Sequence, residues 1–154
     1  MKTKSLSLLL IFLILNVTQT HAQIKPTKID TKNKERYITT TIGYPIIGIY
    51  SYLNKKEPTT QLNENGTGVL QNEDLSKENI IWGIECSQSG IPILQEGFDS
   101  AAYSFWYKKE KLSPLESEEK EEWSYQSFTI HFNKKKIFIS GDRVKEYVEL
   151  ELKK

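Results

Sequence analysis

Ile80-Ile81-Trp82-Gly83-Ile84-Glu85-Cys86 is the stretch that decides the fold of this chain. Every second position carries an apolar side chain, and the positions between them include a glycine and a glutamate. A two-residue period is typical of a β-strand with one buried face. The stretch therefore predicts a half-buried antiparallel strand whose inward residues are Ile80, Trp82, Ile84 and Cys86.

A tight turn precedes this strand. Thr59–Asn63 and Thr67–Gln71 are extended segments that flank Glu64-Asn65-Gly66. Asparagine and glycine tolerate the positive φ angles of a two-residue hairpin turn. The spacing therefore predicts a β-hairpin that precedes the strand Ile80–Cys86.

Similar patterns recur along most of the chain. In one segment the residues that share a face are Tyr103, Phe105 and Tyr107. In a later segment they are Phe128, Ile130 and Phe132. Residues 110–122 interrupt the pattern and indicate a short helix or a mobile acidic loop. The further strands expected are Ile46–Tyr52, Ile91–Gln95, Ala101–Lys109, Trp123–Phe132, Lys136–Ser140 and Val144–Leu150.

These segments predict an all-β domain. Consecutive strands joined by short turns usually pair with each other, and closure of the sheet removes exposed edges. The sequence therefore predicts an up-and-down antiparallel eight-stranded barrel or near-closed barrel. A two-sheet β-sandwich is the alternative.

The N-terminus has the pattern of an export signal. Lys2 and Lys4 precede an apolar run over residues 6–15, and small residues lie at the expected cleavage point before Gln23. We expect residues 1–22 to be a signal peptide, 23–41 a flexible polar segment or a peripheral strand near Tyr37–Thr40, 42–150 the barrel domain and 151–154 a charged tail. The protein is then exported, periplasmic or secreted, and keeps no membrane span after cleavage.

Composition argues against several kinds of site. The 21 basic and 20 acidic residues are nearly balanced, which does not suggest binding to nucleic acid. His131 is the one histidine beyond the leader, and we expect it on the solvent side of a strand. Cys86 is the one cysteine and is expected to be a small buried hydrophobe. We therefore predict no metal, no cofactor and no enzymatic activity.

Short motifs resemble those of a known family. Ile47-Gly48-Ile49-Tyr50, the hairpin Leu62–Gly68, Ile81-Trp82-Gly83-Ile84 and the stretch Phe128–Glu149 are together similar to small bacterial secreted lipocalin-like domains, of the calycin type. The resemblance implies an eight-stranded barrel, which in some members encloses a ligand cavity. It implies no particular activity.

Aromatic residues supply two functional hypotheses. In the first, the protein carries a small apolar ligand inside the barrel, lined by Tyr50, Trp82, Tyr103 and Phe105. In the second, it is a protein-interaction module of the cell envelope, such as an inhibitor, immunity-type or assembly factor. Its partner, an envelope or extracellular protein, would then bind exposed, outward-facing Trp106 and Trp123 beside the acidic residues 116–122.

Overall fold

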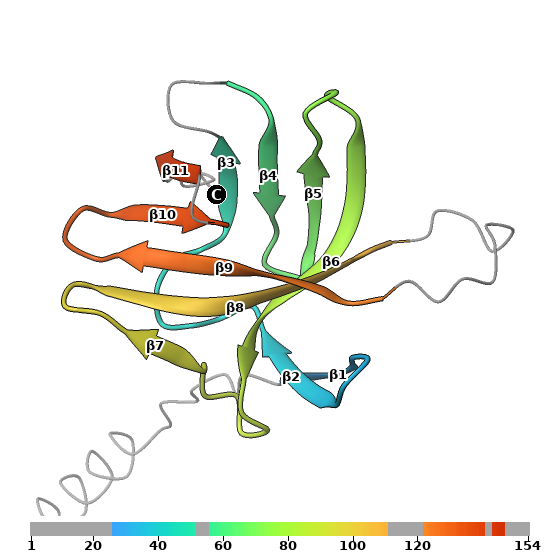
Figure 1. Cartoon of the computed structure of the whole chain (residues 1–154), viewed down its shortest axis with the longest axis vertical. Coiled ribbons are helices and arrows are strands. Elements are labelled where there is room, and N and C mark those ends of the chain that lie inside the picture. The colour runs from blue at the N-terminus through green and yellow to red at the C-terminus, as the bar shows by residue number, and fades with distance from the viewer. Residues whose placement is uncertain (1–25, 52–55, 111–121, 141–142, 147–154) are drawn as a thin grey trace, which may run out of the picture.

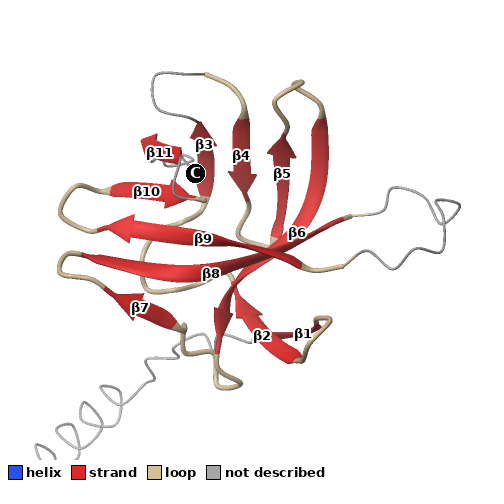
Figure 2. Cartoon of the chain, viewed as in Figure 1, coloured by secondary structure: helices blue, strands red, loops and turns tan. Residues whose placement is uncertain are grey.

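A computed structural model describes residues 26–51, 56–110, 122–140 and 143–146 of the chain, the last of these by backbone alone. The described residues form eleven strands in one antiparallel sheet (Figures 1 and 2). No helix among them is long and apolar enough to cross a membrane. The strands are β1 (Thr27–Asp30), β2 (Glu35–Thr39), β3 (Gly48–Ser51), β4 (Thr59–Leu62), β5 (Thr67–Gln71), β6 (Lys77–Cys86), β7 (Leu94–Glu96), β8 (Ser100–Lys109), β9 (Ser124–His131), β10 (Lys136–Ile139) and β11 (Arg143–Glu146).

Eight of these strands follow one another in space as they do along the chain. The order is β3-β4-β5-β6-β8-β9-β10-β11, and every pairing is antiparallel. The sheet curls into a half-barrel, and its end strands β3 and β11 lie close together (Figure 1). The predicted all-β, up-and-down, barrel-like architecture is confirmed.

The β4–β5 turn forms as its sequence predicts. Gly66 adopts a φ of +82°, which costs a glycine little and a larger residue more. The side-chain oxygen of Asn65 accepts hydrogen bonds from the backbone N–H and the hydroxyl of Thr67, at 3.1 and 2.8 Å. The turn therefore fixes the register in which β4 pairs with β5, with Leu62 opposite Gly68.

The interior of the curled sheet holds the main core. Side chains from β6, β8 and β9 alternate inward as the two-residue period predicts, and residues from β3, β4 and β10 complete the set. Phe132 is an exception, because it follows the end of β9 and is 39% exposed rather than inward. The buried members are Ile46, Tyr50, Leu62, Ile80, Trp82, Ile84, Ala101, Tyr103, Phe105, Phe128, Ile130, Ile137 and Ile139.

A hairpin of β1 and β2 covers part of the outer face. The sequence predicts a flexible segment over residues 23–41 or a peripheral strand near Tyr37–Thr40, and the structure has two paired strands within residues 27–39. β2 pairs with the C-terminal end of β6, so Ile38 lies opposite Glu85. Ile29 and Ile38 of this hairpin pack against Trp106 in a second, outer core cluster. This hairpin is hard to predict from the sequence, because the segment is mostly polar and Ile29 and Ile38 are its two residues in the outer cluster.

β7 is an addition to the eight-strand order. It pairs with the first part of β8, beyond the region that β6 covers. Cys86 and Pro92 form an isolated bridge just before it. The predicted strand Ile91–Gln95 is therefore shifted, and the observed strand begins at Leu94. Most of residues 110–122, and residues 147–150 of the predicted last strand, lie outside the described part of the chain.

Candidate functional site

The four aromatic residues predicted to line a ligand cavity lie together inside the sheet. Tyr50, Trp82 and Phe105 are at most 1% exposed, and Tyr103 is 6% exposed. The Trp82 and Phe105 rings stack with centroids 5.8 Å apart, and the Phe105 and Phe128 rings are 6.0 Å apart. Each of these stacked rings therefore has another ring of the core as its neighbour.

Two of these residues also use their polar atoms within the protein. The Trp82 indole N–H donates to the backbone oxygen of Thr67 at 2.8 Å. The Tyr50 hydroxyl donates to the backbone oxygen of Ile46. Tyrosine and tryptophan usually find such partners when they are buried. Both side chains are thus placed as structural members of the core.

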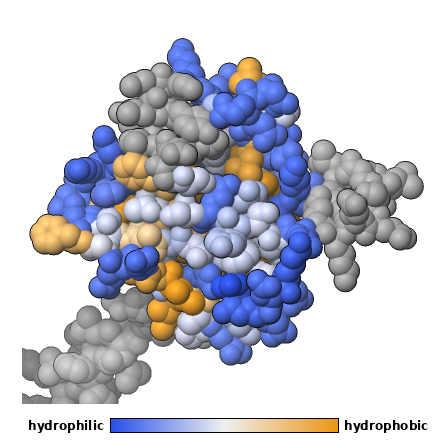
Figure 3. Space-filling model, viewed as in Figure 1, coloured by the Kyte–Doolittle hydropathy of each residue, from blue (hydrophilic) through white to orange (hydrophobic). Residues whose placement is uncertain are grey.

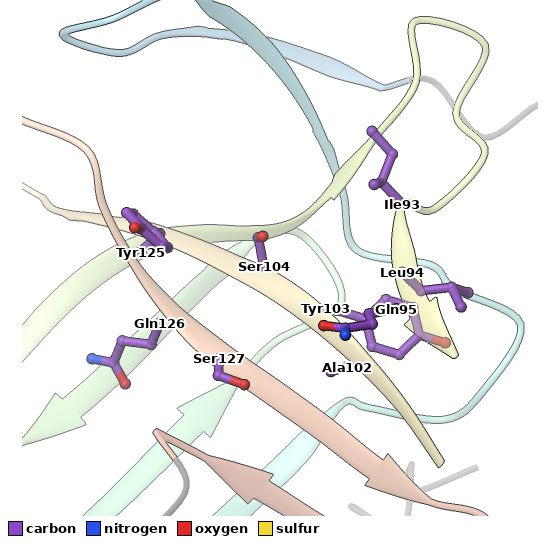
Figure 4. Close-up of a pocket in the computed structure, with 9 residues that line it drawn as sticks. All are labelled: Ile93, Leu94, Gln95, Ala102, Tyr103, Ser104, Tyr125, Gln126 and Ser127. Carbon is purple, nitrogen blue, oxygen red and sulfur yellow. The ribbon is translucent and has the colours of Figure 1, made fainter. Parts of the chain in front are cut away.

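The outer face of the sheet carries a hollow of about 350 Å³ beside β7. Figure 4 shows Tyr125 and Ile93 on opposite sides of Ser104. Ser104 of β8 and Ser127 of β9 lie opposite each other in register and form part of the lining. The full lining is Ile93, Leu94, Gln95, Ala102, Tyr103, Ser104, Tyr125, Gln126 and Ser127.

A second hollow of about 330 Å³ adjoins the first on the side of the β1–β2 hairpin. The two share Ser104 and Tyr125, and together they are called the outer groove below. Small side chains on β8 and β9 leave room for it between β7 and the hairpin. The second hollow is lined by Thr31, Lys32, Asn33, Arg36, Glu85, Ser104, Trp106, Trp123 and Tyr125.

An ion pair and an indole ring form the hairpin side of the outer groove. The Arg36 guanidinium pairs with the Glu85 carboxylate, and their side chains are 22% and 13% exposed. The Trp106 indole N–H donates to the other Glu85 oxygen at 3.1 Å. Arg36 also lies over the Trp106 ring, 4.8 Å from its centroid, which is a favourable cation–π geometry. Three side chains therefore hold one another in place at this wall.

The structure corrects the placement of one predicted partner-binding residue. Trp106 points outward as expected, but the β1–β2 hairpin covers it and leaves it 5% exposed. Trp123 is half-buried against the same cluster, with the Lys108 ammonium 5.4 Å from its ring centroid. The expectation of two exposed tryptophans is thus wrong for Trp106. Of the acidic residues 116–122, Glu122 alone lies in the described part, where it pairs with Lys32.

Exposed apolar side chains gather on the other side of the outer groove. Ile91 is 66% exposed, Ile93 51% and Leu94 39%, and Tyr125 across the groove is 67% exposed. Figure 3 shows hydrophobic surface around β7 in the lower left of the view. The sequence pattern alone did not indicate these residues as a site. One indication of this site is present in the sequence. Apolar residues flank Pro92, and proline is confined to strand starts and sheet edges.

The remaining chemically reactive residues are dispersed. Burial, with a smaller effect from Glu85, raises the pKa of the Cys86 thiol. The His131 ring is half-buried and packs edge-on against Phe138, with centroids 5.0 Å apart. Within the described ranges, no three histidine, cysteine, aspartate or glutamate side chains are close enough together to hold a metal ion.

No protein-family model, curated protein or solved structure matches this chain. The lipocalin-like resemblance of its short motifs stays a prediction. The fold supports the barrel-like part of that expectation, and a fold alone does not determine a function.

Proposed function

We propose that this chain is an exported, non-catalytic binding protein that holds a protein partner in its outer groove. The observation that carries the proposal is that the exposed apolar side chains of Ile93 and Leu94 line the same concave surface as the exposed Tyr125. Exposed apolar patches with polar surroundings mark contact sites, and aromatic residues are enriched in interfaces.

The hairpin side of the outer groove, formed by Arg36, Glu85 and Trp106, suits recognition by shape and hydrogen bonding. Arg36 and Glu85 neutralise each other, and Lys32 is paired with Glu122. A partner that brings an apolar side chain against Ile93 and Leu94 would meet the hydroxyl groups of Ser104 and Ser127 on the groove floor. Such a mixture of an apolar centre and polar rim is typical of protein–protein interfaces.

Packing in the interior favours this surface over the carrier hypothesis. The Phe105 ring stacks against both Trp82 and Phe128, and a ligand between these rings would have to replace those contacts. Titration with a fatty acid is then expected to leave the tryptophan emission unchanged. A saturable change at stoichiometric ligand would instead support a carrier.

Site-specific photo-crosslinking tests the proposal. Tyr125 is replaced by p-benzoylphenylalanine in cells that make and export the protein, and adducts are analysed by mass spectrometry. We expect one discrete adduct with another protein. The double variant Ile93→Glu, Leu94→Glu is expected to abolish it, because two carboxylates would be desolvated against the partner.

The control is Leu75→Glu, which alters an equally exposed side chain on the β5–β6 turn. Leu75 and Ile93 are both 51% exposed, so the two changes are matched in accessibility. The adduct should persist in this variant. An adduct that survives the Ile93→Glu, Leu94→Glu change, or absence of any adduct at Tyr125, would rule the outer groove out as the binding surface.

A further inference from the structure

One edge of β7 has no neighbour among the described strands. β7 pairs with β8 alone, and Figure 1 shows it at the margin of the sheet, below β8. All three of its residues are exposed. The strand borders the outer groove, because Leu94 and Gln95 belong to the lining of the hollow of about 350 Å³. A strand edge without a neighbour presents backbone N–H and C=O groups with which another extended chain can pair.

The turn after β7 shows which backbone groups face this open edge. The Gly97 N–H donates to the Ser100 backbone oxygen at 2.8 Å, on the side of β7 that faces β8. Bonding residues alternate along an antiparallel strand, so the backbone groups of Gln95 face β8 as well. The N–H and C=O groups of Leu94 and Glu96 therefore point away from β8. No backbone hydrogen bond from another described strand or loop reaches them.

The outer edge of β1 offers a comparison, because β2 is the one described strand that pairs with β1. A backbone hydrogen bond closes the β1–β2 turn on the β2 side, so by the same alternation Lys28 and Asp30 direct their backbone groups away from β2. Both residues are charged, and charged side chains at an edge discourage pairing with another chain. β7 has the apolar Leu94 beside Glu96, so its edge is the less protected of the two.

We propose that an extended segment of the protein partner pairs with the open edge of β7 and adds a strand to the sheet. The inference rests on the proposed function and specifies the backbone conformation that the partner brings to the outer groove. Two N–H and two C=O groups, those of Leu94 and Glu96, would bond to this segment. Recognition of this kind combines backbone hydrogen bonds, which give affinity, with sites for alternate side chains, which give specificity.

The register of β7 places such a segment beside the groove. Leu94 lies opposite Tyr103 of the core, so the side chain of Gln95 lies on the other face of the sheet, the face of the outer groove. Figure 4 shows the Leu94 and Gln95 side chains leaving β7 in opposite directions. A partner residue opposite Gln95 would share this outer face. Its side chain would then lie next to the groove lining, while the neighbouring partner residues bond to the edge.

Proline substitution tests the pairing. Leu94→Pro and Glu96→Pro each remove an N–H group that faces the open edge and that the β7–β8 pairing does not use. The measurement is the yield of the adduct that p-benzoylphenylalanine at position 125 forms in cells that export the protein. We expect this yield to fall about threefold to tenfold relative to Leu94→Ala and Glu96→Ala, which shorten the same side chains but keep the N–H.

The matched control lies on the other open edge. Asp30→Pro removes the outward N–H of β1, and its adduct yield should equal that of Asp30→Ala. Thermal unfolding verifies that each variant folds. Hydrogen exchange of the purified adduct needs no substitution in β7, so it decides the matter even where a proline variant unfolds. The amides of Leu94 and Glu96 should exchange about tenfold or more slowly in the adduct than in the free protein, and that of Asp30 should not change.

The outcomes separate this inference from the proposed function. Equal adduct yields for folded proline and alanine variants, or unchanged exchange at Leu94 and Glu96, would overturn the strand pairing and leave the outer groove as the binding surface. Absence of any adduct from position 125 would overturn the proposed function and the strand pairing with it. An adduct with a second copy of this chain would assign the edge to self-association and so contradict the inference.

Discussion

Gly83 of β6 lies directly beneath Ile38 of β2. A Cβ atom added at Gly83 would be 2.8 Å from the Ile38 Cβ and 2.9 Å from its Cδ1. Such a separation is shorter than van der Waals contact allows, so the two positions are complementary in size. The absence of a side chain at Gly83 is what lets the β1–β2 hairpin lie flat on the outer face.

The first prediction concerns this contact. Gly83→Val should lower the free energy of unfolding by about 1–3 kcal/mol, because an overpacked site forces neighbouring groups to move. Urea denaturation measures the change. Combining Gly83→Val with Ile38→Ala should restore part of the loss relative to the sum of the two single variants. Strictly additive losses would show that the two side chains do not compete for the same space.

A second prediction concerns the Arg36–Glu85 ion pair. Arg36→Met should destabilise the protein by about 1–3 kcal/mol, because it leaves the mostly buried Glu85 carboxylate with Trp106 as its remaining side-chain partner. The matched control is Lys28→Met, which breaks the exposed pair with Glu35 at 2.5 Å. Exposed pairs contribute little, so the control should barely change the urea midpoint. Equal effects would contradict a special role for Arg36.

Trp106 and Trp123 should respond differently to truncation. Trp106→Ala removes the centre of the outer cluster and should cost about 3 kcal/mol or more of stability. Trp123→Ala, at a half-buried position, should cost about 1 kcal/mol. Thermal unfolding of the two single variants measures the difference, and equal losses of stability would contradict this prediction.

Stability should fall at alkaline pH. Burial raises the pKa of Tyr103 above its ordinary 10.0, and burial with Glu85 raises the pKa of Cys86 above 9.0. The folded chain therefore keeps these protons when the unfolded chain has lost them. The free energy of unfolding is unaffected well below pH 9 and decreases as the pH rises past each unfolded pKa.

Tyr103→Phe isolates the contribution of one of these groups. The variant should lose less stability above pH 10 than the unaltered protein, as measured by urea denaturation across that range. Tyr125→Phe is the control, because Tyr125 is 67% exposed. Identical pH profiles for the Tyr103 variant and the unaltered protein would contradict the prediction.

Local patterns in the sequence predict much of the fold. The alternation from Ile80 to Cys86 places the inward residues of β6 correctly, since burial on one face imposes a two-residue period. Asn65 and Gly66 predict the β4–β5 turn because glycine readily adopts the positive φ angle that Gly66 has there. Sequential pairing then follows, because short turns leave neighbouring strands few other partners.

Features that depend on distant contacts could not be predicted this way. The burial of Trp106 requires Ile38, which lies far away along the chain and reaches it only after β2 pairs with β6. The outer groove likewise combines residues of the hairpin, β7, β8 and β9. The pattern around Trp106 indicates that it faces outward, but not what covers it.

The serial order of the main strands also bears on how quickly the protein assembles. Contacts between consecutive strands close short loops, and chains dominated by such contacts cross the folding barrier faster than chains with distant pairings. Docking of the β1–β2 hairpin on β6 joins residues that lie far apart along the chain, so we expect it to occur later in folding. Changes at Ile29 or Ile38 should then accelerate unfolding much more than they slow refolding.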